Sequence, residues 1–524
     1  MRLSTAGEMR EMDRLTITGF GIPGRVLMES AGRGATLFLM ECVPDVAQKS
    51  VGILCGRGNN GGDGFVMARC LAEAGAAVRV VLLSKAEKVT GEAAENLALL
   101  PKMGVQVEEL ADEASLSRAL AGMERRQVWI DALLGTGLAS PVRGVFRLAV
   151  DFLNARDGFV FSVDIPSGIS ADTGQILGAA VRAQATATFG LAKPGHLVYP
   201  GKEHTGKLRV VDIGIPKMIM DQVGATHFAL TEDWVKDSLV PRKPEAHKGD
   251  AGRLLVVGGS PGKSGAAVMA ALAAMRVGAG LVTLAGPRSL VPGFQGQAPE
   301  IMALALDETL GGGIAASAAD QILEFAASCD GLALGPGLGM DEETIRMVHR
   351  VVRECPVPMV LDADGLNALA GDLEAVQAAK STAILTPHPG EMARLCGLSP
   401  AAVQADRLGR ARGLAADLGC VCVLKGAATV VALPRGEVWI NTTGNPGMAS
   451  GGMGDVLTGI AAGFLVQGYA PETAARLAVF LHGLAGDRLA DTLGLVGYLA
   501  GDLILELPET LGSFLSKLPI PRQA

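Results

Sequence analysis

The stretch NTTGNPGMASGGMGDVLTG, residues 441–459, decides the fold of the second half of the chain. It carries six glycines, one proline and a single acidic residue, Asp455, before an apolar pattern begins. Glycines let the backbone adopt positive φ and approach a ligand closely. We predict a helix over about residues 455–466, whose first N–H groups and positive dipole end meet the glycines and form an anion site.

Asp455 is an unexpected member of an anion site, because a carboxylate repels an anion. It fits the role of a base that takes a proton from a hydroxyl attacking a phosphate. The alternative interpretation is an aspartate that caps the helix on a glycine-rich turn. The spacing alone favours neither.

Length and composition limit the classes of protein to consider. A chain of 524 residues with 49% hydrophobic, 19% charged and 70 glycine residues predicts two to four domains of a glycine-rich α/β enzyme. Only 4% of the residues are aromatic and the net charge is -8, which argues against nucleic-acid binding.

Three features predict a cytoplasmic protein that does not enter a membrane. The N-terminal sequence MRLSTAGEMREMD has no apolar signal-peptide core. No uncharged apolar run reaches the roughly 18 residues that a membrane span needs. The eight cysteines form no CxxC pair, so we expect buried free thiols in a reducing compartment.

The first half alternates strands with glycine-containing loops. An apolar strand at residues 51–55 is followed by GRGNNGGDG at residues 56–64 and by an amphipathic helix at residues 65–74, the geometry of a phosphate-binding turn. The spacing is not GxGxxG, so the standard dinucleotide fingerprint is not met, and a glycine turn without a ligand is the alternative.

Polar residues follow several predicted strands of this half. The strands at residues 128–131 and 159–164 end in Asp131 and Asp164. Ligands bind at the carboxyl ends of parallel strands, so Asn60, Asp131, Asp164, Ser167 and Lys193 could share one crevice. Each aspartate could instead cap a loop, and Lys193 could be a solvated charge.

The motifs GRGNNGGDGFVMARCL, WIDALLGTGL, SVDIPSG, TFGLAKPG and VVDIGIP, in this order, resemble the NAD(P)H-hydrate epimerase domain. The resemblance covers residues 1–216 and implies a Rossmann-like three-layer fold that interconverts the R and S epimers at C6 of hydrated NADH or NADPH. It implies an acid/base pair, Asp164 and Lys193, and a K⁺ site at Asn60, Asp131 and Ser167. The implied substrate contacts are Asn59, Asn60, Gly61, Gly62, Asp63, Gly135, Thr136, Gly137, Leu138, Ala139, Ser140, Pro141 and Asp164.

Residues 217–245 lack long apolar periodicity and contain prolines in VPRKPEAHKGD, so we expect a connecting segment there. Strands alternate with helices again from residue 246 to residue 524, which predicts a mostly parallel sheet. The loop GGSPGKS lacks the full P-loop spacing. Asp362 and Asp364 could bind Mg²⁺ or cap turns. His388 could hydrogen-bond a substrate or cap the start of a helix before Pro389, and Lys425 could hold a nucleotide phosphate or simply lie at the end of a strand.

The motifs HKGDAGRLLVVGGS, ALGPGLG, LDADGLNAL, TPHPGE, LKG and GNPGMASGGMGDVLTG resemble the ADP/ATP-dependent NAD(P)H-hydrate dehydratase family, which has a ribokinase-like fold. The implied substrate contacts are Ala266, Gly337, His388 and Asp455. The implied nucleotide contacts are Lys425, Gly426, Ala427, Ala428, Thr429 and Gly454.

Together the two resemblances imply a homo-oligomeric repair enzyme for hydrated NADH and NADPH. It would epimerise the R form and dehydrate the S form with a nucleotide, ADP giving AMP and phosphate, assisted by K⁺ and Mg²⁺. The sequence leaves two alternatives, a small-molecule kinase with a fused nucleotide-binding domain and a non-catalytic nicotinamide-nucleotide sensor.

Overall fold

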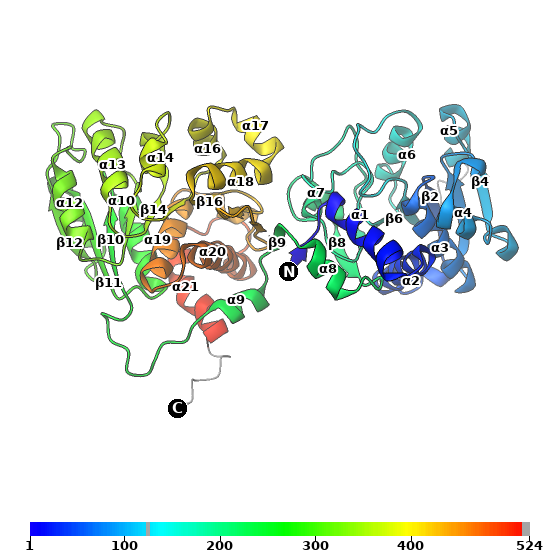
Figure 1. The fold of residues 1–524 in the computed structure, drawn as a ribbon, viewed down its shortest axis with the longest axis horizontal. Helices are drawn as coiled ribbons and strands as arrows, with labels where there is room; N and C mark the ends of the chain where they lie inside the picture. Colours follow the sequence, from blue (N-terminus) through cyan, green and yellow to red (C-terminus); the bar gives the residue numbers. More distant parts are fainter. Residues whose placement is uncertain (122–125, 516–524) are drawn as a thin grey trace. The chain divides into compact units, whose positions relative to one another are not determined.

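The computed structural model describes residues 1–121 and 126–515, and the chain divides into two compact units. The first unit is Arg2–His227, and the second is Phe228–Ala524 together with Met1. Each unit has its own sheet, with helices packed against it (Figure 1). The α/β fold class predicted from the sequence is therefore confirmed.

The first unit contains a seven-stranded parallel sheet in the order β4-β3-β2-β5-β6-β7-β8. Its strands are β2 (Ser50–Cys55), β3 (Ala77–Leu82), β4 (Gln106–Glu109), β5 (Val128–Ala132), β6 (Phe159–Val163), β7 (Ala185–Phe189) and β8 (Lys207–Val211). The strand order reverses between β2 and β5, which is the place where ligands bind in open α/β sheets.

Helices cover both faces of this sheet, because its central strands are buried on both sides. One core contains side chains from α1 (Ala6–Arg14), α2 (Gly24–Cys42), α3 (Asn59–Glu73) and α4 (Gly91–Leu97). A second core contains side chains from α5 (Glu113–Ala121) and α6 (Gly144–Asn154). The unit thus has three layers, as expected.

The sheet of the second unit runs in the order β9-β18-β17-β16-β15-β14-β13-β10-β11-β12. Its strands are β9 (His227–Ala229), β10 (Arg253–Val257), β11 (Leu281–Pro287), β12 (Met302–Leu306), β13 (Gly331–Leu334), β14 (Met359–Leu361), β15 (Ala383–Leu385), β16 (Val421–Leu424), β17 (Val430–Ala432) and β18 (Val438–Ile440). Neighbours from β12 to β16 are parallel, whereas β17 pairs antiparallel with β16 and β18. The order reverses between β10 and β13.

Helix α19 (Met453–Val466) lies in the centre of the second unit, with twelve of its fourteen residues buried. It packs closely on α10 (Ser264–Arg276), because a Cβ atom on Gly459 would lie only 2.0 Å from the carbonyl oxygen of Ala270. Helices α20 (Pro471–Leu493) and α21 (Ala500–Leu515) complete this layer. The predicted helix begins two residues earlier than expected, after Gly452 in the left-handed conformation.

Other helices carry residues of the sites described below: α13 (Glu342–Glu354), α14 (Ala363–Ala368), α16 (Pro389–Cys396) and α18 (Arg407–Leu418). The stretch expected to be a connecting segment contains α8 (Lys217–Val223), β9 and α9 (Glu232–Ser238).

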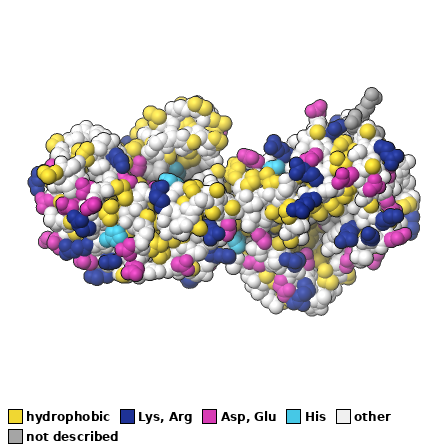
Figure 2. Space-filling view, turned by 90° about the horizontal axis from the view of Figure 1, so that it is seen from above, with side chains coloured by type: hydrophobic (Ala, Val, Ile, Leu, Met, Phe, Trp, Pro, Cys, Tyr) yellow, Lys and Arg dark blue, Asp and Glu magenta, His cyan; other side chains and the backbone are white. Residues whose placement is uncertain are grey.

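The surface charges and the state of the cysteines are as expected from the sequence. Lys and Arg side chains are interspersed with Asp and Glu over the face seen in Figure 2. All eight cysteines are free. In the part of the chain that the structure describes, no helix is both long enough and apolar enough to cross a membrane.

Candidate active sites

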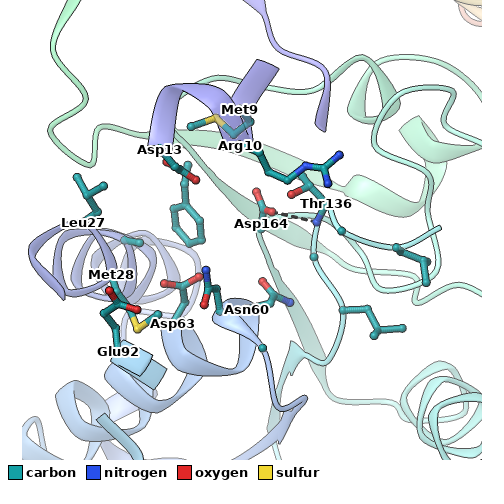
Figure 3. Close-up of a pocket in the computed structure, with 18 of the residues that line it drawn as sticks. Met9, Arg10, Asp13, Leu27, Met28, Asn60, Asp63, Glu92, Thr136 and Asp164 are labelled. Carbon is teal, nitrogen blue, oxygen red and sulfur yellow. Dashed lines mark hydrogen bonds between the residues drawn. The ribbon is translucent and has the colours of Figure 1, made fainter. Parts of the chain in front are cut away.

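The first unit contains a cavity of about 750 Å³ at the carboxyl ends of β2, β5 and β6 (Figure 3). Its wall includes most of the predicted substrate contacts: Asn59, Asn60, Asp63, Gly135, Thr136, Gly137, Leu138, Ala139, Ser140 and Asp164. Three predicted contacts, Gly61, Gly62 and Pro141, are not part of the wall. Gly61 and Gly62 instead permit close packing of the first turn of α3, since Cβ atoms there would lie 1.9 Å from the oxygen of Gly56 and 2.6 Å from Met28.

Asp164 and Lys193 form a buried ion pair in this cavity. The ammonium group of Lys193 donates to Asp164 Oδ1 at 2.8 Å, to Thr188 Oγ1 at 2.8 Å and to the carbonyl oxygen of Phe189 at 3.1 Å. Burial opposes the ionisation of Asp164, but Lys193 outweighs burial and lowers the pKa of this carboxyl. The pair is therefore a carboxylate beside an ammonium group, held ready for proton exchange.

His196 joins the backbones of these two residues, a role that the sequence analysis did not identify. Its Nδ1 accepts a hydrogen bond from the N–H of Lys193 at 3.0 Å. Its Nε2 lies 2.9 Å from the carbonyl oxygen of Asp164, which can only accept, so Nε2 carries the proton. Burial and the nearby Lys193 lower the pKa of His196 to about 4, and the neutral ring matches this pattern.

The three residues predicted to bind K⁺ have distinct surroundings. Asp131 is fully buried and accepts hydrogen bonds from Ser167 Oγ at 2.6 Å, Ser167 N at 2.8 Å and Ser162 Oγ at 2.9 Å. Asn60 is 9% exposed, and its amide oxygen and nitrogen have no hydrogen-bond partner among the described residues. Burying an amide group without hydrogen-bond partners costs free energy of folding, which indicates that a ligand binds to Asn60.

Three more carboxyl groups reach the cavity. Asp63 comes from the first turn of α3 and Asp13 from α1, a helix for which we predicted no functional role. Burial raises the pKa of Asp63 well above its usual range, with Asp164 and Asp13 adding to the effect. Glu92 of α4 also lines the cavity, whose wall therefore carries four carboxyl groups together with the buried Lys193.

The second unit has a charged cluster at the carboxyl ends of β14, β15 and β16. Lys425 Nζ lies 2.5 Å from Asp362 Oδ1 and 3.7 Å from Glu391 Oε2. Thr458 Oγ1 of α19 donates to Asp362 Oδ2 at 2.6 Å, so Asp362 anchors both Lys425 and the helix that follows the glycine-rich stretch. Burial opposes the charge of Lys425, but Asp362 and Glu391 outweigh it and raise its pKa.

Asp455 lies in the first turn of α19, beside this cluster. Burial and the negative charge of Asp362 raise the pKa of Asp455 to about 7, although Lys425 acts in the opposite direction. The neighbouring Gly454 leaves room for a ligand, because a Cβ atom there would come within 3.4 Å of Lys425 Nζ. A carboxyl group poised near neutrality beside a lysine and a helix N-terminus suits a general base.

His388 has the capping position that was the alternative interpretation. Its Nδ1 accepts hydrogen bonds from the N–H groups of Gly390 at 2.9 Å and Glu391 at 3.4 Å, while Glu391 bonds back to the N–H of His388 at 2.7 Å. The side chain is nevertheless 50% exposed, and its Nε2 lies 3.4 Å from Glu391 Oε1 at the edge of the cluster.

Ala266 and Gly337, two predicted substrate contacts, lie together where the strand order reverses. Gly337 has φ +66°, and a Cβ atom there would lie 3.3 Å from the Cβ of Ala266. Nearby, Asp364 accepts hydrogen bonds from Lys263 Nζ at 3.0 Å and from the N–H of Gly339 at 2.9 Å. The loops after β10 and β13 are thus tied together by Asp364.

The predicted nucleotide loop, residues 425–429, is supported from behind by Arg407 of α18. The guanidinium group donates to the carbonyl oxygens of Leu424, Lys425 and Ala428 at 3.2 to 3.5 Å. Arg407 is 8% exposed, and among the described residues no carboxylate forms an ion pair with it. Burial lowers its pKa to about 10.

Unusual backbone conformations also mark the two sites. Among the described residues, Asp164, Ala363 and Ala428 are the non-glycine residues with positive φ, at 64°, 48° and 54°. The first belongs to the cavity of the first unit, the second follows Asp362, and the third lies in the nucleotide loop. Such conformations cost energy and concentrate at functional sites.

The glycine-rich stretch of the second unit is fixed by side chains outside it. Asp487 of α20 accepts hydrogen bonds from Gly444 N at 2.9 Å and Asn445 Nδ2 at 3.0 Å. Tyr498 donates its hydroxyl to Asn445 Oδ1 at 2.8 Å, and His482 Nε2 lies 2.9 Å from the carbonyl oxygen of Met453. The sequence analysis missed these three supporting residues.

Two protein families match the two units. A family described as NAD(P)H-hydrate dehydratase matches residues 254–509, and one described as YjeF-related protein N-terminus matches residues 24–195. The described residues contain no group of three or more His, Cys, Asp or Glu side chains that could hold a metal ion.

Curated relatives match nearly the whole chain. The bifunctional NAD(P)H-hydrate repair enzyme Nnr of Moorella thermoacetica is 44% identical over 519 residues, 98% of this chain and 97% of the relative. The protein of the same name from Escherichia coli is 36% identical over 512 residues, 96% and 92% of the two chains. The crystal structure of ADP/ATP-dependent NAD(P)H-hydrate dehydratase from Bacillus subtilis, co-crystallized with ATP/Mg²⁺, shares 34% identity, with 54% of this chain and 97% of that chain covered and a TM-score of 0.47.

Proposed function

This chain belongs to the family of bifunctional NAD(P)H-hydrate repair enzymes, and we propose that its two units divide the repair between them. The first unit epimerises C6 of hydrated NADH and NADPH, and the second dehydrates the S epimer at the expense of a nucleotide phosphoanhydride. The observation that carries this proposal is the pair of poised sites: the buried Asp164–Lys193 pair in one unit and Asp455 on the glycine-bounded helix N-terminus in the other.

Epimerisation needs the C6 hydroxyl to leave and return on the opposite face of the ring, or the ring to open and close. In either route a proton moves to and from an oxygen atom at C6. Asp164 and Lys193 line the cavity and are joined at 2.8 Å, so they can take up and release such a proton. His196 bonds to the backbones of both residues and so fixes their positions relative to each other.

The oxygen atoms of Asn60, Asp131 and Ser167 are of the kind that K⁺ binds. Asn60 Oδ1 is unpartnered, and Asp131 and Ser167 add a carboxylate and a hydroxyl, all ligands suited to a hard cation. When bound, K⁺ would neutralise the buried charge of Asp131 and hold the loops of the cavity in place. We include Asn60, Asp131 and Ser167 in the proposal as its ligands.

Dehydration in the second unit begins with Asp455. Its carboxylate takes the proton of the C6 hydroxyl as the oxygen attacks the terminal phosphoryl group of ADP or ATP, with ADP giving AMP and a C6 phosphate ester. The N–H groups at the start of α19 and Lys425 stabilise the charge of the transferring group. The ring nitrogen then expels phosphate, and loss of a proton from C5 leaves NADH or NADPH.

Mg²⁺ fits this arrangement as a partner of the nucleotide, because it is commonly held by one or two carboxylates and substrate phosphates. Glu391, 3.7 Å from Lys425 Nζ, is the carboxylate that we expect to face it. The proposal includes a cytoplasmic location, which the eight free thiols support, and an assembly of identical copies.

The direct test supplies both epimers of hydrated NADH with K⁺, Mg²⁺ and either ADP or ATP, and follows the absorbance of the reduced nicotinamide. Recovery of both epimers, the R form faster than it epimerises spontaneously, is expected. A stable phosphorylated product without NADH would instead indicate a kinase, and binding without turnover would indicate a sensor.

Arg407 provides a test of the nucleotide loop. We expect Arg407→Met to raise the KM for the nucleotide about 10- to 100-fold, because hydrogen bonds from a charged group to three loop carbonyls are lost. Initial rates at varied nucleotide concentration measure the effect. Arg412→Met, on the exposed side of the same helix, is the matched control, and an unchanged KM in Arg407→Met would exclude a role for Arg407 in shaping the loop.

A further inference from the structure

Asp13 is a carboxylate of the first cavity to which the mechanism above gives no task. It lies on α1, on the same side as Met9 four residues earlier, and both line the cavity. Figure 3 shows Asp13 entering from α1 above the cavity, with Asp63 on α3 below it and Asp164 to one side. We propose that Asp13 is a further catalytic residue of the epimerase, one that exchanges a proton with the C6 oxygen on the ring face that Asp164 and Lys193 do not serve.

The position of Asp13 is fixed by its helix. Helix α1 starts with a capping box in which Thr5 and Glu8 bond to each other's backbone N–H groups. Asp172 accepts a hydrogen bond from the N–H of Ala6 at 2.7 Å, and Met12 is fully buried. These contacts hold the last turn of α1, with Asp13, against the cavity.

The carboxylate of Asp13 is not used by the fold. Within residues 1–121 and 126–515 it makes no hydrogen bond or ion pair, although it is half-buried. Lys193, Asp164 and Asp63 interact with its charge, and the charged side chains of Arg10, Arg57 and Glu92 line the same cavity. Burial raises the pKa of Asp13 to about 6, with Lys193 opposing and Asp164 adding to the shift.

The chemistry of epimerisation calls for two proton-exchanging groups when water leaves and returns. On one face, an acid protonates the C6 hydroxyl, the C6–O bond breaks, water departs and the nitrogen lone pair forms a C6=N1 iminium. On the other face, a base takes a proton from the incoming water as the new C6–O bond forms. The number of protons on the enzyme is unchanged overall, and the two groups exchange roles in the reverse direction.

One pair of touching residues cannot serve both faces of a planar ring. Asp164 and Lys193 share a proton-exchanging position, since their atoms lie 2.8 Å apart. Asp63 also reaches the cavity, but its side chain is more deeply buried than that of Asp13, and burial raises its pKa well above the usual range. Asp13 has no hydrogen-bond or ion-pair partner among the described residues, lines the cavity from α1, and has its pKa raised to about 6 by burial.

The inference rests on the proposed epimerase activity, and the experiment separates the two. The full chain and the variants Asp13→Asn, Asp13→Glu and Glu11→Gln are compared for conversion of pure R epimer, with the S epimer as a parallel substrate. We expect Asp13→Asn to lower kcat for epimerisation by about 100-fold or more, with little change in KM and with S-epimer dehydration unaffected. Asp13→Glu should restore part of the rate, and Glu11→Gln, on the exposed face of the same helix, should match the wild type.

Two further readouts distinguish catalysis from support of the fold. For the wild type, kcat/KM should rise as the pH increases through about 6 in the direction in which Asp13 is the base that takes a proton from water, and it should fall in the reverse direction, in which Asp13 is the acid. Both changes should vanish in Asp13→Asn. In water enriched with ¹⁸O, each epimerisation by the wild type should introduce one labelled oxygen at C6. The proposal would be overturned if Asp13→Asn epimerised as fast as the wild type, or if the wild type left the C6 oxygen unlabelled. If the wild type did not epimerise at all, the proposed function itself would be overturned.

Discussion

Replacing Asp455 with asparagine is expected to lower the rate of nucleotide-dependent NADH formation from the S epimer by about a thousandfold or more. The amide cannot accept the hydroxyl proton, while its size preserves the packing at the start of α19. Epimerisation of the R form in the first unit should remain unchanged. The measurement is the initial rate of NADH formation from pure S epimer with ADP and with ATP.

The pH dependence offers a second readout of the same residue. The pKa of Asp455 is raised from 3.8 to about 7, so the carboxyl is protonated and inactive as a base below that pH. The value of kcat/KM for dehydration should therefore rise as the pH increases through about 7. Asp491→Asn, an exposed change on α20, serves as the control and should keep both the rate and the pH profile. An Asp455→Asn variant within tenfold of the wild type would show that another group is the base.

Replacing Asp164 with asparagine is expected to reduce conversion of the R epimer to its spontaneous rate, a loss of about 100-fold or more. Dehydration of the S epimer should continue at the wild-type rate, because Asp455 and its surroundings belong to the other unit. Asparagine tolerates the positive φ of this position, so the backbone should hold its shape. The assay follows recovery from the pure R epimer in the presence of nucleotide.

The partner residue supplies a control for stability. Lys193→Met leaves the buried Asp164 charge unpaired and should destabilise the first unit by about 3–5 kcal/mol. The double variant Asp164→Asn, Lys193→Met removes both charges and should recover part of that loss while remaining inactive on the R epimer. Thermal unfolding measures the first effect. Equal stability of the wild type and Lys193→Met would mean that the ion pair is not held in a buried state.

The strand ends were the part of both sites that the sequence predicted well. An aspartate or glycine run directly after a buried apolar strand indicates a ligand-facing loop. This rule placed Asn60, Asp164 and Lys193 in one cavity, whereas Asp131 and Ser167, predicted to share it, are not part of its wall. The family resemblance stated from the motifs is likewise confirmed by the curated relatives. The assignment of individual site residues remains a prediction that the variants above test.

Supporting residues escaped prediction for a physical reason. His196, Arg407 and His482 act on backbone carbonyl groups of segments that become their neighbours only after folding. Asp13 was missed because a carboxylate in an amphipathic helix is usually solvent-facing, and only the packing of α1 turns it to the cavity. The antiparallel strand β17 was not predicted, whereas the equally short β14, β15 and β18 were.

The left-handed backbone of Asp164 also affects how the activity can be lost. Asparagine and glycine are the two residues that best accept this conformation, and a single base substitution converts an aspartate codon into either. Each of these changes removes the carboxylate while leaving the local chain path intact. A single mutation can therefore abolish epimerisation while the first unit stays folded. That unit could then evolve as a binding domain.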